Sequence, residues 1–263
     1  MKKYRGVFLK NEHEIAKMRI ANGMVSRVLD ALGEAVKPGI STMFLEDVAQ
    51  EVCHKMNVKP AFQGYYGFPF ALCCSVNETI VHGFPSKDRI LQEGDIVSCD
   101  MGVCYEGFYG DSARTFFVGD VSQEAKDLCR VTEESLHYGI AAARIGNTLY
   151  DISAAVQRHA EKNGLKVIRN YVGHGIGANL HEKPEVPNFV PKGGFDLPLQ
   201  EGMVLAIEPM LAIGTYEVVI LPDKWTANTK DGSLAAHFEH TVAITSDGPE
   251  ILSLSSNYSG SYW

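Results

Sequence analysis

Residues 95–118 have the sequence DIVSCDMGVCYEGFYGDSARTFFV, in which Glu106-Gly107 separates two strand-like runs. A turn pair of this kind between apolar runs predicts a β-hairpin. With Glu106-Gly107 as a two-residue turn, Gly102 faces Asp111, and Asp100 lies diagonal to Asp111 on the same face. The Cα atoms of the two aspartates are then about 7–8 Å apart, close enough for their carboxylates to share a metal site. A three-residue loop would instead place them on opposite faces.

Segments with helical spacing of their apolar residues flank this hairpin. Together with candidate caps at Ser41, Thr42 and Ser122, the spacing predicts helices over residues 15–36, 44–56, 122–144 and 149–163. The order helix, glycine turn, helix, strands therefore occurs twice. We expect an α+β fold in which two related halves, about 10–118 and 120–252, form one domain over residues 1–263 around a sheet-lined cleft.

The composition is that of a globular chain: 263 residues, 24 Lys plus Arg, 32 Asp plus Glu and 45% hydrophobic residues. A net charge of −8 and a pI near 5.6 argue against a surface built to grip nucleic acid or an anionic membrane. No apolar run approaches the roughly 18 residues of a membrane span. Six irregularly spaced cysteines, all in the first half of the chain, favour reduced thiols and a cytoplasmic location.

A second pattern is YVGHGIG over residues 171–177, where glycine stands on both sides of His174. We expect these glycines to leave open space around the imidazole. The pattern lacks the G-x-G-x-x-G order and a following Lys-Ser/Thr, so it does not indicate nucleotide binding. A lone histidine is more often a core or surface residue than a metal ligand. His174 is therefore a candidate ligand only together with other polar residues of the chain.

Two such polar residues are glutamates in apolar strand-like runs, Glu208 in residues 203–210 and Glu239 in residues 238–244. Glutamate is a poor strand former, and a buried carboxylate needs a proton, a cationic side chain or a metal. Taken singly, each acidic residue has an ordinary alternative. The aspartates could cap a turn or pair with Arg114, and the glutamates could end a strand or lie on a solvated face.

Taken together, the polar candidates are four carboxylates and one imidazole: Asp100, Asp111, His174, Glu208 and Glu239. Two divalent ions would balance the four negative charges. An oxygen-rich donor set with one imidazole suits Mn, Fe, Co or Zn, whereas a cysteine-rich set would have indicated structural zinc. A two-metal site can hold a bridging water and polarise a carbonyl, which predicts hydrolysis.

At this point the chain resembles the type I methionine aminopeptidases, which have the pita-bread fold: two pseudo-symmetric halves with a central curved antiparallel sheet covered by helices. The resemblance runs from Lys10 to about Leu252. It rests on six ordered motifs, which are Asn77-Glu78 with Val81-His82-Gly83-Phe84-Pro85, Asp95-Ile96-Val97 with Asp100, Gly107–Asp111, Gly173–Gly177 with His181-Glu182, Ile207–Met210, and Glu239-His240-Thr241.

The resemblance implies that Asp100, Asp111, His174, Glu208 and Glu239 are the ligands of a dinuclear metal centre, with Asp111 and Glu239 bridging the ions. It also implies three catalytic residues. His82 would hydrogen-bond the scissile amide or its leaving nitrogen, His181 would steady the carbonyl oxygen, and Glu208 would shuttle the proton. The ordinary alternative for His181 is an exposed loop histidine.

The resemblance further implies an apolar, sulfur-lined pocket for methionine, a suitable site for a polarisable thioether. Its residues would be Tyr65, Phe68, Cys73, Leu180 and Trp225, with Phe62 alongside and with His82 and His181 contacting the substrate. Phe62, Phe68 and Leu180 depart from the residues that are familiar in the family, so the shape of this pocket stays open. For Tyr65 and Trp225 the alternative is core packing.

The implied activity is removal of N-terminal methionine when the second residue is small, by attack of a metal-bridged water on the scissile carbonyl. Alternatives are a proline-specific dipeptidase or aminopeptidase of the same fold and a non-catalytic binding module. The proline-specific enzymes are longer chains than this one. The non-catalytic modules have lost metal ligands, and all five ligands are present here. We expect a monomer that acts on nascent polypeptide N-termini, with the ribosome as a candidate partner and no membrane or nucleic-acid contact.

Overall fold

The computed structural model describes residues 2–194 and 196–256. Its four α-helices, counted within those ranges, are α1 Glu12–Ala35, α2 Thr42–Lys55, α3 Gln123–Ala142 and α4 Leu149–Lys162. All four predicted helices are therefore confirmed. Asn11, Ser41 and Ser122 cap the first three through side-chain oxygens that accept backbone N–H groups, which explains where these helices begin.

The strands of the described chain build one large sheet and three small ones. The large sheet has nine antiparallel strands in the order β10-β9-β11-β16-β7-β6-β3, with β17 paired to β16 and β4 paired to β6. A short 3-10 helix, η1, covers Tyr65–Gly67. The strands are β1 Lys2–Tyr4, β2 Val7–Leu9, β3 Lys59–Pro60, β4 Leu72–Val76, β5 Thr79–Val81, β6 Ile96–Tyr105, β7 Phe108–Phe117, β8 Lys166–Val167, β9 Gly173–Gly175, β10 Glu182–Val186, β11 Val204–Ile207, β12 Met210–Ala212, β13 Val218–Ile220, β14 Ala227–Thr229, β15 Ala235–His237, β16 Glu239–Thr245 and β17 Gly248–Ile251.

The hairpin of β6 and β7 has the predicted register. Gly102 pairs with Asp111, and Asp100 pairs with Ala113, so Asp100 and Asp111 lie on one face. Glu106 and Gly107 both have positive φ, 47° and 79°, as a two-residue hairpin turn requires. The alternating residues of β6, among them Cys99 and Met101, point to the opposite face and join the apolar core.

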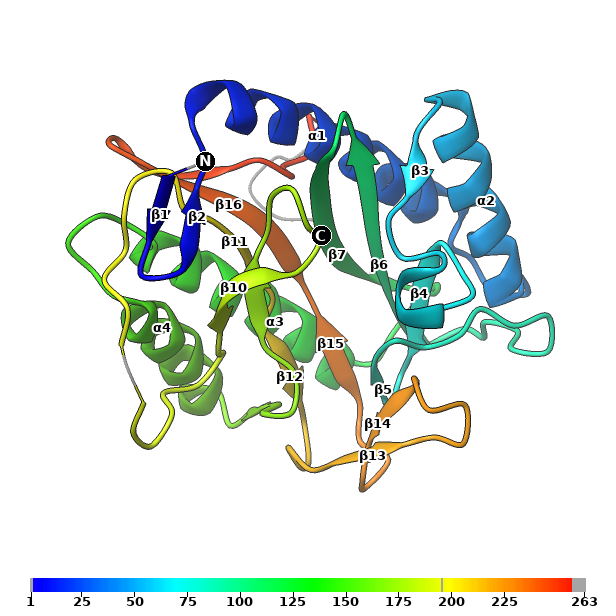
Figure 1. The fold of residues 1–263 in the computed structure, drawn as a ribbon. Helices are drawn as coiled ribbons and strands as arrows, with labels where there is room; N and C mark the ends of the chain where they lie inside the picture. The colour runs from blue at the N-terminus through cyan, green and yellow to red at the C-terminus, as the bar shows by residue number, and fades with distance from the viewer. Residues whose placement is uncertain (1, 195, 257–263) are drawn as a thin grey trace.

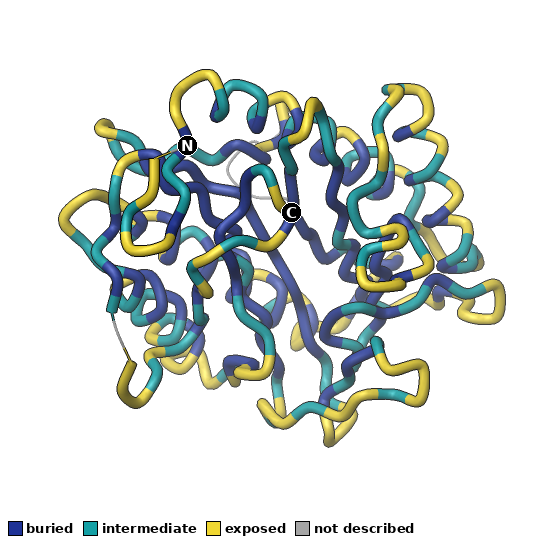
Figure 2. The backbone as a smooth tube through the Cα atoms, viewed as in Figure 1, coloured by how far each residue is buried: buried dark blue, intermediate teal, exposed yellow. Residues whose placement is uncertain are grey.

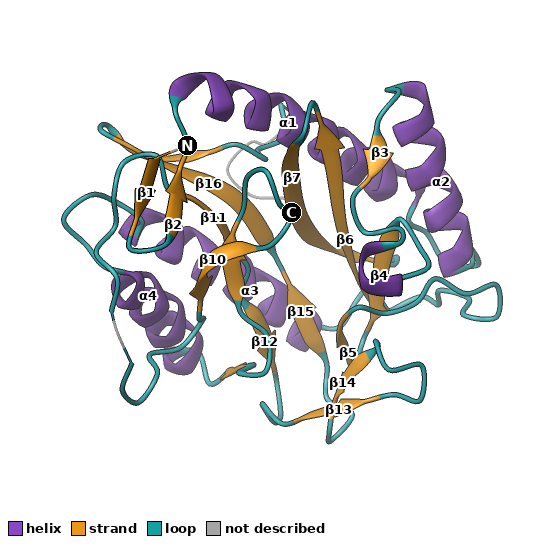
Figure 3. Cartoon of the chain, in the orientation of Figure 1, coloured by secondary structure: helices purple, strands orange, loops and turns teal. Residues whose placement is uncertain are grey.

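The helices pack in two pairs behind the sheet, α1 with α2 and α3 with α4 (Figures 1 and 3). Leu32 of α1 and Leu45 of α2 belong to the cluster that covers β4 and β6. Leu136 of α3 and Ile152 of α4 belong to the cluster that covers β11 and β16. One face of the sheet is thus sealed by apolar side chains, and the other face is left for polar ones.

Burial follows this layering. Figure 2 shows the central strands as buried and the connecting loops as largely exposed. Asp111, His174 and Glu239 are buried polar residues on these central strands. Across residues 2–194 and 196–256, no helix combines the length and apolar character that crossing a bilayer needs.

Candidate active site

A cavity of about 200 Å³ opens on the polar face of the large sheet. It gathers all twelve residues that the sequence indicated for metal binding, catalysis or substrate binding, together with Phe62 and Tyr66. The lining residues are Phe62, Tyr65, Tyr66, Phe68, Cys73, His82, Asp100, Asp111, His174, Leu180, His181, Glu208, Trp225 and Glu239.

The acidic end of the cavity is built by strand pairing. Ala113 of β7 pairs with Asp100 on β6 and with Glu239 on β16, so a small methyl group lies between two carboxylates. Asp111 is two residues before Ala113 and points to the same face. On the other side, His174 of β9 pairs with Ala206 of β11. Glu208 follows β11 directly, two residues beyond Ala206, and does not lie within a strand.

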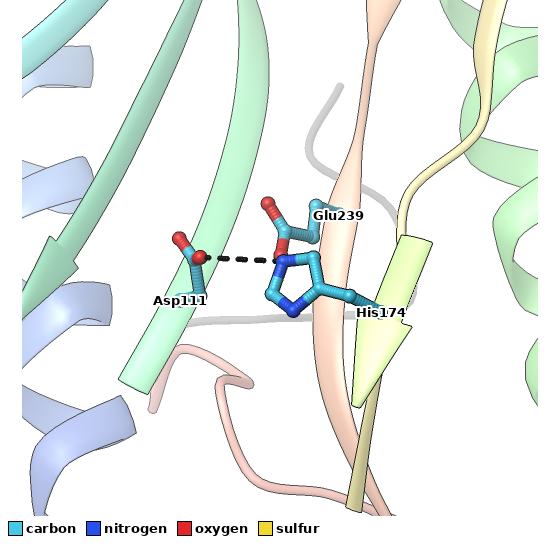
Figure 4. A group of neighbouring side chains, drawn as sticks. All are labelled: Asp111, His174 and Glu239. Carbon is cyan, nitrogen blue, oxygen red and sulfur yellow. Dashed lines mark ion pairs between the residues drawn. The ribbon is translucent and has the colours of Figure 1, made fainter. Parts of the chain in front are cut away.

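The side chains of Asp111, His174 and Glu239 point toward one another (Figure 4). One ligand atom from each of Asp111, His174 and Glu239 lies within 4.8 Å of the others. The Nε2 atom of His174 is 3.8 Å from Asp111 Oδ2 and 3.6 Å from Glu208 Oε1. Its Nδ1 lies 2.9 Å from the Gly175 carbonyl oxygen, which can only accept a hydrogen bond. Nδ1 therefore carries the proton, and the bare Nε2 faces the carboxylates.

The electrostatics of this end favour a cation. Burial raises the pKa of Asp100 to about 7. Burial, and to a smaller extent the charges of neighbouring carboxylates, raise the pKa values of Asp111 and Glu239. Within the described chain, Asp100 Oδ1, Asp111 Oδ1 and Glu239 Oε1 are buried without a hydrogen-bond partner. No described lining residue is Lys or Arg. Buried carboxylate oxygens without donors, beside a bare imidazole nitrogen, fit divalent metal ions.

The glycines beside His174 do not leave open space, so that expectation is wrong. A Cβ at Gly173 would overlap with the carbonyl oxygen of Ala206, and one at Gly175 would overlap with that of Lys183. These glycines let β9 approach the backbones of β11 and β10 closely. This close approach fixes the backbone of His174 between these two strands.

The other end of the cavity is aromatic. The Phe68 ring packs edge-on against Trp225 with a centroid distance of 5.2 Å. Cys73 pairs with Asp100 across β4 and β6 and therefore lies on the same face, next to the acidic end. Burial, followed by the charge of Asp100, raises the pKa of the Cys73 thiol, so it is a neutral group that lines the pocket with sulfur.

Two histidines lie between these ends. His82 packs edge-on against Tyr171 at 5.2 Å and lies 6.2 Å from the Trp225 ring. His181 is exposed and lies in a bend just before β10, as its ordinary alternative has it, but it is held there, because its Nδ1 is 2.9 Å from the Tyr65 hydroxyl. Its ring is 4.2 Å from that of His174.

Sequence reasoning missed three residues here, Tyr66, Tyr171 and His237. His237 is 1% exposed, its Nε2 is 3.7 Å from Glu208 Oε2, and this atom has no hydrogen-bond partner in the described part of the chain. Its position two residues before Glu239, on the same side of an extended chain, was the available signal. Tyr66 follows Tyr65 directly in sequence and packs against it, whereas Tyr171 reaches the site through its contact with the distant His82.

Residues 16–246 of the chain match the model of "Metallopeptidase family M24". The chain belongs to metallopeptidase family M24. Within M24, the methionine aminopeptidase of Clostridium perfringens is 52% identical over 248 residues, 94% of this chain and 99% of that protein. The crystal structure of methionine aminopeptidase from Thermotoga maritima is 46% identical with a TM-score of 0.91, covering 94% of this chain and 99% of that one. The predicted resemblance to type I methionine aminopeptidases is confirmed.

A more distant M24 structure shows how widely the fold is shared. The prolidase from Pyrococcus horikoshii has a TM-score of 0.74 at 24% identity and covers 94% of this chain but 64% of its own. This likeness confirms the predicted pita-bread fold and carries no more than the fold. The proline-specific alternative is not favoured, because the identity to methionine aminopeptidases is about twice as high.

Proposed function

We propose that this chain is a metal-dependent methionyl aminopeptidase that removes N-terminal methionine from nascent proteins and peptides when the second residue is small. One observation carries the proposal: a single cavity joins a cluster of four carboxylates and His174, in which Asp111, Glu239 and His174 are buried, to an aromatic pocket that contains a thiol. The first part suits metal-assisted hydrolysis of an amide, and the second suits a flexible thioether side chain.

The metal cofactor would be two divalent ions, with Co, Mn, Fe and Zn as the candidates. When bound, the ions supply a water of lowered pKa and polarise the scissile carbonyl. The buried carboxylate oxygens of Asp100, Asp111 and Glu239 that have no hydrogen-bond partner support this role. The proposed ligands are Asp100, Asp111, His174, Glu208 and Glu239.

The proposed catalytic residues are His82, His181 and Glu208. Burial, with His181 nearby, lowers the pKa of His82 to about 4. Its neutral imidazole can therefore hydrogen-bond the scissile amide or the leaving nitrogen at neutral pH. When the Tyr65 hydroxyl donates to Nδ1 of His181, Nε2 carries the proton and can donate to the carbonyl oxygen. Burial, and to a smaller extent the charge of Asp100, raises the pKa of Glu208, which favours proton uptake by this carboxylate.

The methionine side chain would lie in the aromatic end of the cavity. The proposed contacts are Tyr65, Phe68, Cys73, Leu180 and Trp225, with His82 and His181 at the scissile bond. The cavity volume of about 200 Å³ limits the groups that fit beside these rings. A bulky second residue would clash at its mouth, so Gly, Ala, Ser, Thr, Cys, Pro and Val are the expected second residues.

Further parts of the proposal concern the whole chain. We expect a cytoplasmic monomer in which residues 1–263 act as one catalytic domain, with the ribosome as a candidate partner. The six cysteines, all of them free thiols, support the reducing compartment. The pairs α1–α2 and α3–α4, each followed by strands, support related halves over about 10–118 and 120–252.

The deciding experiment counts metal per purified chain and compares three peptides, Met-Ala-Ser, Met-Leu-Ser and Ala-Pro-Ser. We expect rapid cleavage of Met-Ala-Ser alone, loss of that activity in a chelator, and recovery with Co or Mn. Rapid cleavage of Ala-Pro-Ser alone would support the proline-specific alternative. Full activity after complete metal removal would reject metal-assisted hydrolysis.

A further inference from the structure

A buried ion pair outside the cavity joins the start of the chain to the segment that carries His181. Lys10 Nζ lies 2.7 Å from Glu182 Oε2, and the two side chains are 0% and 2% exposed. The residues are 172 positions apart in sequence. Burying such a pair costs desolvation energy, and apolar residues of similar volume are often as stable or more so. Stability alone is therefore a weak explanation for this pair.

Each charged group is held by further contacts. Lys10 Nζ also donates to the Phe8 carbonyl at 3.2 Å, and the Lys10 backbone N–H donates to the Gly202 carbonyl at 2.7 Å. The second oxygen of Glu182 accepts the backbone N–H of Asn179 at 3.1 Å. The Glu182 carboxylate therefore links Lys10, which is held by Phe8 of β2 and by Gly202, to the turn formed by residues 177–181.

This turn is packed directly on the ion pair. A Cβ at Gly177 would overlap with Lys10 Cε and lie 2.9 Å from Glu182 Oε1, so glycine lets the turn approach the pair. The Gly177 carbonyl accepts the backbone N–H of Tyr109 at 2.9 Å, and its own N–H donates to the Asn179 carbonyl at 3.1 Å. Leu180 and His181 stand between Asn179 and Glu182, and both line the cavity.

We propose that Lys10 and Glu182 are positioning residues, which hold the turn of residues 177–181 so that His181 and Leu180 face the cavity. The inference rests on the proposed function only for the role of His181. Without the carboxylate, the Asn179 N–H and the Lys10 ammonium lose their common partner, and the turn can shift relative to Tyr65. A displacement of about 1 Å in a positioning group can lower a rate by roughly 10²-fold.

The test is a double-mutant cycle of Glu182→Gln and His181→Ala, measured as kcat and KM on Met-Ala-Ser with Mn content. We expect E182Q to lower kcat at least about tenfold, with a smaller change in KM and normal Mn content. In the His181→Ala background, E182Q should change kcat less than about twofold. The matched control is Glu250→Gln, which breaks a second long-range pair, between Arg19 of α1 and Glu250, and should leave kcat unchanged.

Two outcomes would overturn the proposal: a kcat of E182Q within about twofold of wild type, or the same loss in both backgrounds. If E182Q fails to fold, the double variant Lys10→Met with Glu182→Leu removes both charges and keeps a similar volume. This variant should fold and still show the reduced kcat. Wild-type kcat in it would mean that the pair is only structural.

A spectroscopic readout separates this inference from the proposed activity. In the zinc-loaded protein, the His181 imidazole resonances are assigned by their loss in His181→Ala, and E182Q should shift or broaden them. Unchanged His181 resonances would refute the positioning role even if wild type cleaves Met-Ala-Ser. If wild type cleaves no methionyl peptide, the proposed function fails, and these resonances still decide the inference.

Discussion

At the scale of single residues, the spacing of the carboxylates at the acidic end of the cavity is set by a small residue, Ala113, between two of them. Asp100, Ala113 and Glu239 form one row across β6, β7 and β16, so the methyl group of Ala113 separates the two carboxylates of this row. Like charges at this spacing repel each other and oppose ionisation. The row is therefore suited to hold cations and is unsuited to be a purely structural feature.

Replacing Asp111 by Asn tests this view directly. The change removes one charge from the cluster, and we expect it to lower metal content by at least one ion per chain and nearly abolish turnover of Met-Ala-Ser. Asp120→Asn is the control, since Asp120 is exposed in the connection after β7. If Asp111 only capped a turn, D111N would cost about 1 kcal/mol of stability and keep both metal and activity.

His82→Ala separates catalysis from metal binding. Because His82 would act on the scissile amide and lies outside the ligand set, kcat should fall by about 10²–10⁴-fold while metal content stays near normal. His and Ala both carry a Cβ, so the positive φ of 59° at this position strains both alike. Loss of metal from H82A would make His82 a ligand and would contradict the assignment.

At the scale of elements, helix α1 is fixed against strand β7 by direct backbone contact. A Cβ at Gly110 would lie 2.7 Å from the backbone N of Asn22 and 2.8 Å from the carbonyl carbon of Ala21. The next residue, Asp111, donates its backbone N–H to the Asn22 side chain at 3.2 Å. The helix therefore sets the position of the strand that carries a central carboxylate.

Two glycine-to-alanine changes, one at this contact and one away from it on α1, should change stability in opposite directions. Gly110→Ala forces α1 away from β7 and should destabilise the protein by about 1–3 kcal/mol, with a loss of turnover. Gly23→Ala lies inside α1 with no atom within 4 Å of the new Cβ, and should stabilise it by roughly 0.5–1 kcal/mol. Denaturant unfolding of both variants measures this, and a destabilised G23A or a neutral G110A would contradict the packing argument.

These elements were largely predictable, because the signals for them are local. Glu106-Gly107 fixes the hairpin register, and Ser41 and Ser122 fix two helix starts, all within a few residues. The glycines beside His174 were misinterpreted for the opposite reason. The carbonyl groups that require them belong to Ala206 and Lys183, which only the tertiary structure brings close.

At the scale of the whole molecule, the first helix is tied to the last strand of the large sheet. The Arg19 guanidinium on α1 donates to both carboxylate oxygens of Glu250 on β17, at 2.6 and 2.8 Å. Both side chains are about one-third exposed, so solvent screens the pair. The hydrogen bond from Arg19 lowers the pKa of Glu250, although partial burial opposes this.

This shift predicts a pH-dependent stability. A lowered carboxyl pKa adds stability above the ordinary value of 4.5, and the gain is lost as the pH falls through the lower folded value. At pH 7, Glu250→Gln should cost about 0.5 kcal/mol or less, because the pair is screened. Denaturant unfolding from pH 7 down to pH 3 should show the two proteins converging below pH 4.5. A difference that grows on acidification would refute the sign.

Assembly of the site was only partly predictable. The five proposed ligands could be found because together they form a set of four carboxylates and one imidazole, whereas His82 and His181 were implied only by the resemblance to type I methionine aminopeptidases. His237 and Tyr66 were missed although each stands within two residues of an indicated residue, Glu239 or Tyr65. The Lys10–Glu182 pair could not be found, because its two residues lie 172 positions apart. Such contacts become visible only when the order of the strands in the sheet is known.

The order of strands also has a consequence for how the protein is made. β16, residues 239–245, lies between β11 and β7 and completes the sheet from its middle. In a growing chain the large sheet therefore stays divided between β11 and β7 until residues 239–245 have been synthesised, and contacts over such sequence distances form slowly. Asp100 and Asp111 are made early, whereas Glu239 arrives with β16. A translation product that stops before Glu239 thus lacks one of the proposed metal ligands, and we expect it to have no peptidase activity.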